Sequence, residues 1–126
     1  MRHTVYDAGT LIAADRGDRT FWAEHRVRLE MGVVPVVPSV VIAQVSRSTR
    51  QVGLRRALRG CHAIGLTEDG AHAIGRLLGL STTADVADAA VVLAARSGGQ
   101  IATGDGDEIA HLLAAAKLAE VAILRC

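Results

Sequence analysis

The feature that most constrains the fold is a regular alternation of short apolar runs with longer helical patterns. Five runs have the length and composition of strands, at residues 3–6, 33–37, 61–66, 100–103 and 121–125. Strands that alternate with helices in this way form parallel sheets with helices on both faces. The sequence therefore predicts an α/β fold: a three-layer sandwich around a central, mostly parallel sheet of about five strands.

The helical segments carry their own start and stop signals. Asp18, Ser39 and Thr67 stand where N-caps are expected, and Gly32 and Gly60 stand where helices should end. The pattern predicts helices over 8–16, 18–31, 39–48, 54–60, 68–79, 85–97 and 108–116. No repeat or linker interrupts them, so residues 1–126 are expected to form a single domain.

Composition excludes several other classes of protein. The longest apolar run, over 33–43, contains prolines and is too short to span a membrane. Because the segment after Met1 has a strand pattern rather than that of a signal peptide, we expect a cytoplasmic protein without membrane association. Cys61 and Cys126 are then expected to be free thiols.

Charge is distributed unevenly, although the net charge is only +1. Between Met31 and Thr67 there is no Asp or Glu, and the stretch carries Arg47, Arg50, Arg55, Arg56 and Arg59. Arg is the side chain best suited to bind phosphate with two parallel hydrogen bonds.

Five of the eight aspartates lie either at the end of a predicted strand or at the start of the helix before the fourth strand. Asp7 ends the first strand, Asp105 and Asp107 follow the strand over 100–103, and Asp85 and Asp88 begin the preceding helix. Ligands of open α/β sheets bind at the carboxyl ends of the strands, where the strand order reverses. If the first strand and the strand over 100–103 are neighbours, Asp7 and Asp105 meet.

Asp88 is the most informative of these residues because its helix is apolar on most faces. An unpaired buried carboxylate is costly, and a cation removes that cost. Taken singly, Asp7, Asp85 and Asp107 have an alternative as helix caps or dipole partners, Asp105 as a turn residue, and Asp88 as the partner of a distant Arg. A cluster of all five instead calls for a divalent ion, and oxygen ligands suit Mg²⁺ or Mn²⁺.

Three segments resemble the PIN-domain family, and more narrowly its VapC-type toxins: "VYDAGTLIAA", "VVPSVVIAQVSR" and "ADVADAAVVLAARSGGQIATGDGDEIAHL". The resemblance covers essentially the whole chain. It implies a PIN-like three-layer sandwich and a Mg²⁺- or Mn²⁺-dependent endoribonuclease, the toxin of a toxin–antitoxin pair. By position, Asp7, Asp88 and Asp105 would be the catalytic metal ligands, Asp85 and Asp107 supporting acids, and Thr103 a residue that orients a ligand or water.

The resemblance also implies partners. RNA would reach the site past Arg47, Arg50 and Arg55, a cognate antitoxin would neutralise the activity, and the protein would form a homodimer. One position departs from the family pattern, because Gln44 stands where relatives have a glutamate. This leaves two readings: an active variant in which other acids compensate, or a PIN-like protein that binds RNA or a partner with weakened or lost nuclease activity.

The stretch "VYDAGTL" also resembles the first motif of haloacid-dehalogenase phosphatases. That chemistry needs a second aspartate two residues after the nucleophile, and this chain has Gly9 there. It also needs a lysine before the last acidic motif, whereas the only lysine, Lys117, follows it. The phosphatase reading is therefore disfavoured.

Overall fold

A computed structural model describes residues 3–82, 85–96, 98–118 and 120–125. Its centre is a five-stranded sheet in the order β3-β2-β1-β4-β5, and every strand pair is parallel. The strands are β1 (Thr4–Tyr6), β2 (Val36–Pro38), β3 (His62–Ile64), β4 (Gln100–Thr103) and β5 (Ala122–Arg125). The predicted α/β sandwich with a central parallel sheet is confirmed.

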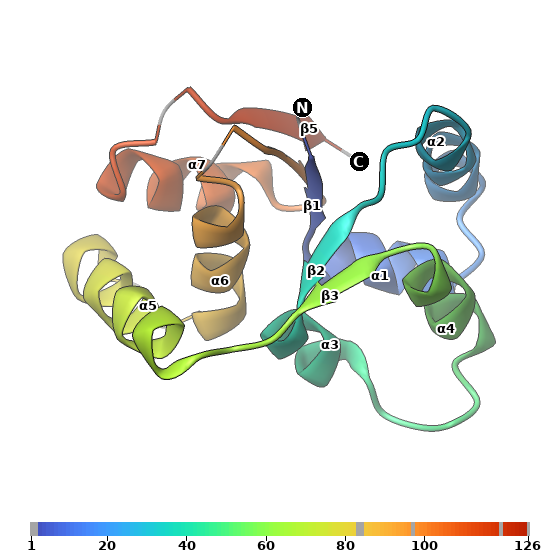
Figure 1. Cartoon of the computed structure of the whole chain (residues 1–126), viewed down its shortest axis with the longest axis horizontal. Coiled ribbons are helices and arrows are strands. Elements are labelled where there is room, and N and C mark those ends of the chain that lie inside the picture. Colours follow the sequence, from blue (N-terminus) through green and yellow to red (C-terminus); the bar gives the residue numbers. More distant parts are fainter. Residues whose placement is uncertain (1–2, 83–84, 97, 119, 126) are drawn as a thin grey trace.

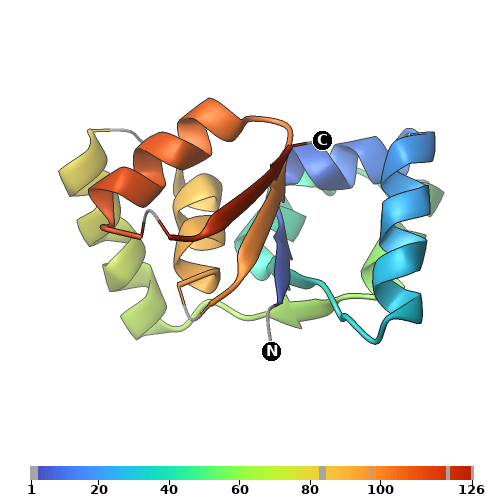
Figure 2. The same cartoon turned by 90° about the horizontal axis from the view of Figure 1, so that it is seen from above.

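Helices cover both faces of the sheet. They are α1 (Ala8–Asp15), α2 (Arg19–Glu30), α3 (Ser39–Val45), α4 (Val52–Arg59), α5 (Glu68–Ser81), α6 (Val86–Ala94) and α7 (Gly106–Ala115). Both views place α5, α6 and α7 on one side of the sheet and α1, α2 and α4 on the other (Figures 1 and 2). The molecule therefore has two distinct helical layers, built respectively from the C-terminal and the N-terminal half of the chain.

The core is aliphatic, as the scarcity of aromatic residues predicts. Val5 of β1 and Ile101 of β4 are fully buried, and α6 buries small residues on most of its surface. Small side chains allow a helix to lie close to a sheet, which explains an Ala- and Val-rich helix at the centre of the molecule. Asp88 is thus carried by the most deeply buried helix.

Several element boundaries differ from those predicted, and three of the differences bear on the sheet and the site. β2 begins at Val36 and runs into Pro38, so Ser39 is already the first helical residue and makes no cap bond, with Pro38 at the N-cap. β3 is reduced to His62–Ile64, an exposed edge strand. Helix α7 begins at Gly106 rather than Glu108, because Asp105 takes the N-cap that the sequence assigned to Asp107.

Helices α1 and α4 pack unusually closely around Gly53. A Cβ at this position would lie 2.6 Å from the carbonyl oxygen of Ala14 and 2.9 Å from Asp15 Cα. The Asp15 carboxylate also accepts a hydrogen bond of 3.1 Å from the Leu54 amide, one of the amides that the start of α4 leaves without a helical partner. The two helices therefore form one unit.

Cys61 is half-buried and its thiol donates a hydrogen bond to the carbonyl oxygen of Ala57. Burial raises the pKa of this thiol to about 12, so it stays protonated at neutral pH and is a free cysteine. Cys126 lies outside the described residues. No single helix in the described part of the chain has the length and apolarity to cross a membrane, although α5 and α6 together would meet both criteria across a 109° bend.

Candidate functional site

The strand order brings the two predicted acidic strand ends side by side. β1 pairs with β4 in parallel, and Tyr6 lies opposite Ala102 in this register. The next residues are Asp7 on one strand and Thr103 on the other. The chain order also reverses here, because β2 and β3 extend from one side of β1 while β4 and β5 lie on the other. This is the position at which open α/β sheets bind ligands.

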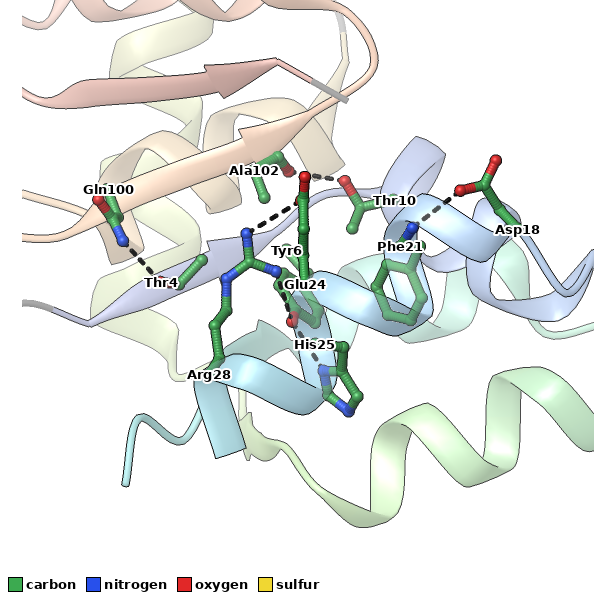
Figure 3. A network of polar contacts seen from close by, with 10 residues as sticks. All are labelled: Thr4, Tyr6, Thr10, Asp18, Phe21, Glu24, His25, Arg28, Gln100 and Ala102. Atoms are coloured by element: carbon green, nitrogen blue, oxygen red, sulfur yellow. Dashed lines mark hydrogen bonds and ion pairs between the residues drawn. The ribbon is translucent and has the colours of Figure 1, made fainter. Parts of the chain in front are cut away.

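Asp7 is buried, with only 3% of its surface exposed. One of its carboxylate oxygens accepts a hydrogen bond of 2.9 Å from the Thr10 amide and so caps α1. Its other oxygen accepts a hydrogen bond from the Thr103 hydroxyl of β4. The hydroxyl of Thr10 donates to the carbonyl oxygen of Ala102, 2.8 Å away, and ties the start of α1 to β4 (Figure 3). Asp7 is held from both strands.

Thr103 connects Asp7 with Asp105. While its hydroxyl donates to Asp7, its oxygen accepts a hydrogen bond of 2.9 Å from the Asp105 amide. Asp105 in turn is the N-cap of α7, and its side chain is exposed. The structure thus places the predicted ligand-orienting threonine between two of the predicted metal ligands.

Asp85 and Asp88 occupy the start of α6. Asp85 is the N-cap, and its carboxylate accepts a hydrogen bond of 3.0 Å from the Asp88 amide. Three helices, α1, α6 and α7, therefore each begin with a capping aspartate. The alternative assigned to Asp7 and Asp85, a helix cap, is correct as a local description, but it does not account for Asp88.

Asp88 carries the electrostatic signature of the cluster. The pKa of its carboxyl is raised to about 7, most strongly by burial and then by four neighbouring carboxylates: Asp85, Asp7, Asp105 and Glu108. Each of these is an acid held near Asp88 by a different element or helix turn. The structure therefore brings Asp7, Asp85, Asp88 and Asp105 together, and a proton or a cation is needed to relieve their repulsion.

The donor chemistry of this cluster fits a hard divalent cation, because it consists of carboxylate and hydroxyl oxygens. The side chains do not yet converge into a coordination shell: within the described ranges, no three His, Cys, Asp or Glu side chains form a group that could hold an ion. Both oxygens of Asp7 already accept a hydrogen bond, although a carboxylate has further lone pairs for a metal. Binding would require the side chains to rearrange.

Glu108 is the acid that the sequence did not single out. Starting α7 at Gly106 places Glu108 in the first turn, where its amide donates to the Asp105 carboxylate over 3.4 Å. It acts on Asp88, whereas Asp107 is exposed and is not among the carboxylates that raise the pKa of Asp88. Two residues correspond to a rotation of about 200° around a helix, so a helix start predicted two residues too late draws attention to Asp107 and not to Glu108.

Gln44 lies in the last turn of α3. It is exposed near the end of α3 and lines a hollow of about 290 Å³ together with Asp15, Arg16 and Arg47, among others. None of the five aspartates singled out from the sequence lines this hollow. Arg47 donates to the carbonyl oxygens of Ala43 and Ser46 at the end of α3.

The predicted RNA-binding residues Arg47, Arg50 and Arg55 are all exposed, on α4 and on the segment between α3 and α4. Arg16, which the sequence did not single out, adjoins Arg47 in the hollow. The structure therefore groups these arginines around α4 and places the aspartates at the sheet edge.

Behind Asp7, Tyr6 anchors β1 to α2. Its hydroxyl lies 2.7 Å from His25 Nδ1 and accepts a hydrogen bond of 3.1 Å from Arg28 (Figure 3). Burial lowers the pKa of His25, and the neighbouring Arg28 lowers it further, so the ring is neutral at neutral pH and can accept the tyrosine proton. This contact fixes the last residue of β1 directly before Asp7.

Comparison with known proteins supports the fold. No family model matches the sequence, and no curated protein matches it. One solved structure, that of VapBC2 from Rickettsia felis bound to a DNA fragment from their promoter, contains a chain that superposes with a TM-score of 0.69. The match covers 98% of this chain and 98% of that chain at 12% sequence identity. The resemblance predicted from the sequence is therefore confirmed as a shared fold over the full length.

Proposed function

We propose that this protein is a metal-dependent endoribonuclease and the toxin of a VapBC-type toxin–antitoxin pair. One observation carries the proposal: burial, together with four carboxylates from the starts of α1, α6 and α7, raises the pKa of the half-buried Asp88 to about 7. Such a cluster is unfavourable unless protons or cations occupy it. The fold shared with a VapBC2 chain gives the same site its functional context.

In this proposal Asp7, Asp88 and Asp105 hold Mg²⁺ or Mn²⁺, with Asp85 and Asp107 as supporting acids and Glu108, which acts on Asp88, as a third. Bound there, such an ion would supply water activation and stabilisation of the negative charge that develops on an attacked phosphodiester. Thr103 binds the carboxylate of Asp7 and the backbone amide of Asp105, and the Thr10 amide fixes the other oxygen of Asp7. The role of the chain is to hold these acids close together before the ion arrives.

RNA is the substrate class in this proposal. Arg47, Arg50 and Arg55 are exposed and lie in the stretch without acids, so they would hold the backbone phosphates. The partners proposed are a cognate antitoxin and a second copy of the chain, and a cytoplasmic location follows from the same reading. The chain of similar fold comes from VapBC2 bound to promoter DNA, which supports an antitoxin partner here.

The decisive experiment combines metal binding with RNA cleavage. We expect the wild-type protein to bind Mn²⁺ in a calorimetric titration and to cut a structured RNA when Mn²⁺ is present. Asp88→Asn should abolish both. Asp69→Asn is the matched control, because Asp69 is an exposed aspartate in the first turn of α5 and lies outside the cluster. Equal cleavage by wild type and Asp88→Asn would point to a contaminating nuclease and refute the proposal.

A second candidate is a PIN-like protein that binds RNA or a partner with weakened or lost nuclease activity. Gln44 favours it, because this residue has no charge to lend to a cation and lines a hollow that none of the five aspartates lines. The same experiment separates the two candidates. Tight RNA binding without Mn²⁺-dependent cleavage would select the binding protein.

A further inference from the structure

A second polar region lies between α2 and α4, on the side of the sheet away from α5 to α7 (Figure 1). It is a hollow of about 910 Å³ lined by Trp22, His25, Arg26, Arg56, Arg59 and Gly60, among others. A hollow of this size is within the range of known ligand sites and can hold more than one nucleotide. None of the five aspartates singled out from the sequence lines it.

The hollow has an unbalanced positive charge. Of its three arginines, Arg26 is paired with Glu30 at 3.2 Å. In the described ranges no carboxylate lies within ion-pair distance of Arg56 or Arg59, both of which are exposed. Two guanidinium groups without a counter-ion in one hollow favour an anionic ligand, and guanidinium geometry suits phosphate.

An aromatic wall stands beside these charges. The Arg56 guanidinium lies over the Trp22 ring, 5.0 Å from its centroid, which is cation–π geometry. The indole N–H donates to the carbonyl oxygen of Ala14 at 3.1 Å, and Phe21 and His25 pack edge-on against the ring. The platform is therefore held rigidly. Unpaired bases stack on such aromatic rings and on arginine planes.

Gly60 lines the hollow at a point where there is little room for a side chain. A Cβ at this position would lie 3.0 Å from Leu29 Cδ1 and 3.3 Å from His25 Nε2. The hollow also borders the end of α1, since Gly17 lines it and Trp22 binds Ala14. Because α1 has eight residues, this places the hollow about 12 Å, one helix length, from its capping residue Asp7.

We propose that the α2–α4 hollow is a binding site for single-stranded nucleic acid, in which Arg56 and Arg59 hold phosphates and a base stacks against the Trp22–Arg56 pair. The site is separate from the acidic cluster and does not require it. An acidic peptide would satisfy the charges but would leave the planar Trp22–Arg56 surface without a matching group. The observations therefore favour the nucleic acid.

The test measures binding without catalysis. Fluorescence anisotropy of a labelled single-stranded oligonucleotide, one RNA and one DNA of the same sequence, is recorded in EDTA with the full chain over a range of salt concentrations. Trp22 is the only tryptophan, so its intrinsic fluorescence reports directly on the hollow. We expect binding to change the Trp22 emission. An RNA preference would indicate a contact to the 2′-hydroxyl, and equal binding would indicate phosphate and base contacts alone.

The double variant Arg56→Ala/Arg59→Ala should bind about tenfold more weakly. The slope of log affinity against log salt should fall by about 1.4, because two phosphate contacts of a single strand are lost. Arg76→Ala/Arg96→Ala is the matched control, since it removes two exposed arginines from the other helical layer. It should leave both quantities and the Trp22 signal unchanged.

Arg56→Lys separates stacking from charge. It keeps the positive charge, so the salt slope should stay at the wild-type value while the affinity and the Trp22 signal decrease. An unchanged affinity in the double Ala variant, or an equal loss in the Arg76/Arg96 control, would overturn the proposal. A poly-Glu peptide that changes the Trp22 emission when neither oligonucleotide does would also overturn it, in favour of a protein partner.

Asp88→Asn distinguishes this site from the proposed nuclease function. The variant should lose Mn²⁺ binding and keep oligonucleotide binding in EDTA. Loss of binding in the Arg56/Arg59 variant with Mn²⁺ binding intact supports the α2–α4 site whether or not the acidic cluster cuts RNA.

Discussion

The acidic sheet edge and the arginine-rich α2–α4 face both gather charges of one sign, but only the arginines are all exposed to solvent. At the edge, Asp7, Asp85, Asp88 and Asp105 are brought together, and burial and the neighbouring carboxylates raise the pKa of Asp88 to about 7. On the α2–α4 face, Arg55, Arg56 and Arg59 extend into solvent, which screens them. Only at the acidic edge do the like charges measurably repel one another, as the raised pKa of Asp88 indicates. Charge that is held together against its own repulsion indicates a ligand of opposite sign more strongly than exposed charge does.

The largest expected difference between the two regions is in activity. Asp7→Asn removes one negative charge. The NH₂ group of the new amide cannot accept a hydrogen bond, so it cannot replace the carboxylate oxygen that faces the Thr10 amide or the Thr103 hydroxyl. If the proposed function is correct, Mn²⁺-dependent RNA cleavage should fall at least ~100-fold, because the loss of one metal-ligating charge reduces both binding and catalysis. Arg56→Ala should change cleavage of a short RNA far less. A similar loss of RNA cleavage in Asp7→Asn and in Arg56→Ala would show that the two regions do not differ in their role in catalysis.

The next largest effect concerns the packing of the α1–α4 unit. Gly53→Ala places a methyl group 2.6 Å from the Ala14 carbonyl oxygen, and both backbones must move. We expect the free energy of unfolding to fall by about 2–3 kcal/mol, the usual cost of overpacking. Urea unfolding measures it. Gly75→Ala is the control, since a Cβ there meets nothing within 4 Å. A neutral Gly53→Ala would mean that α4 is not anchored to α1.

A smaller effect is expected on the pH dependence of stability, because the pKa of Asp88 differs between the folded and unfolded states. The folded pKa of Asp88 is raised from 3.8 to about 7, so between these values the unfolded state releases the proton while the folded state keeps it. Stability should therefore decrease as the pH rises from about 4 to about 7 and then level off. Asp88→Asn stays neutral and avoids this loss.

Without metal, Asp88→Asn should be more stable than wild type by about 1 kcal/mol at pH 8, after allowance for solvent screening of a half-exposed group. The advantage should disappear near pH 4. Thermal unfolding in EDTA at both pH values measures it. A variant less stable than wild type at pH 8 would show that Asp88 is paired with a cation of the protein.

The smallest effect is predicted for Gln44→Glu. None of the five aspartates lines the hollow at Gln44, so we expect the Mn²⁺ affinity to change by less than about twofold. Isothermal titration measures it. An increase of tenfold or more would place position 44 at the metal site and would extend the acidic edge to the end of α3.

The sequence predicted the fold class and the aspartates of the cluster because both depend on periodic features. Alternating strands and helices require a parallel sheet, and parallel strands end at one edge. Helix boundaries were less predictable. Asp105 and Asp107 are equally good caps by residue type, and only the path of β4 into α7 selects Asp105. That choice decided that Glu108, and not Asp107, acts on Asp88.

By itself, the sequence determined a five-stranded α/β domain, the clustering of aspartates at strand ends, and a stretch of arginines without acids. Only the tertiary structure decided which groups meet. It placed β4 beside β1, linked Asp7 to Asp105 through Thr103, stacked Arg56 on Trp22 and placed Gln44 in a separate hollow. The physical reason is that periodicity specifies the elements, whereas strand order and close packing specify contacts between residues far apart in the chain.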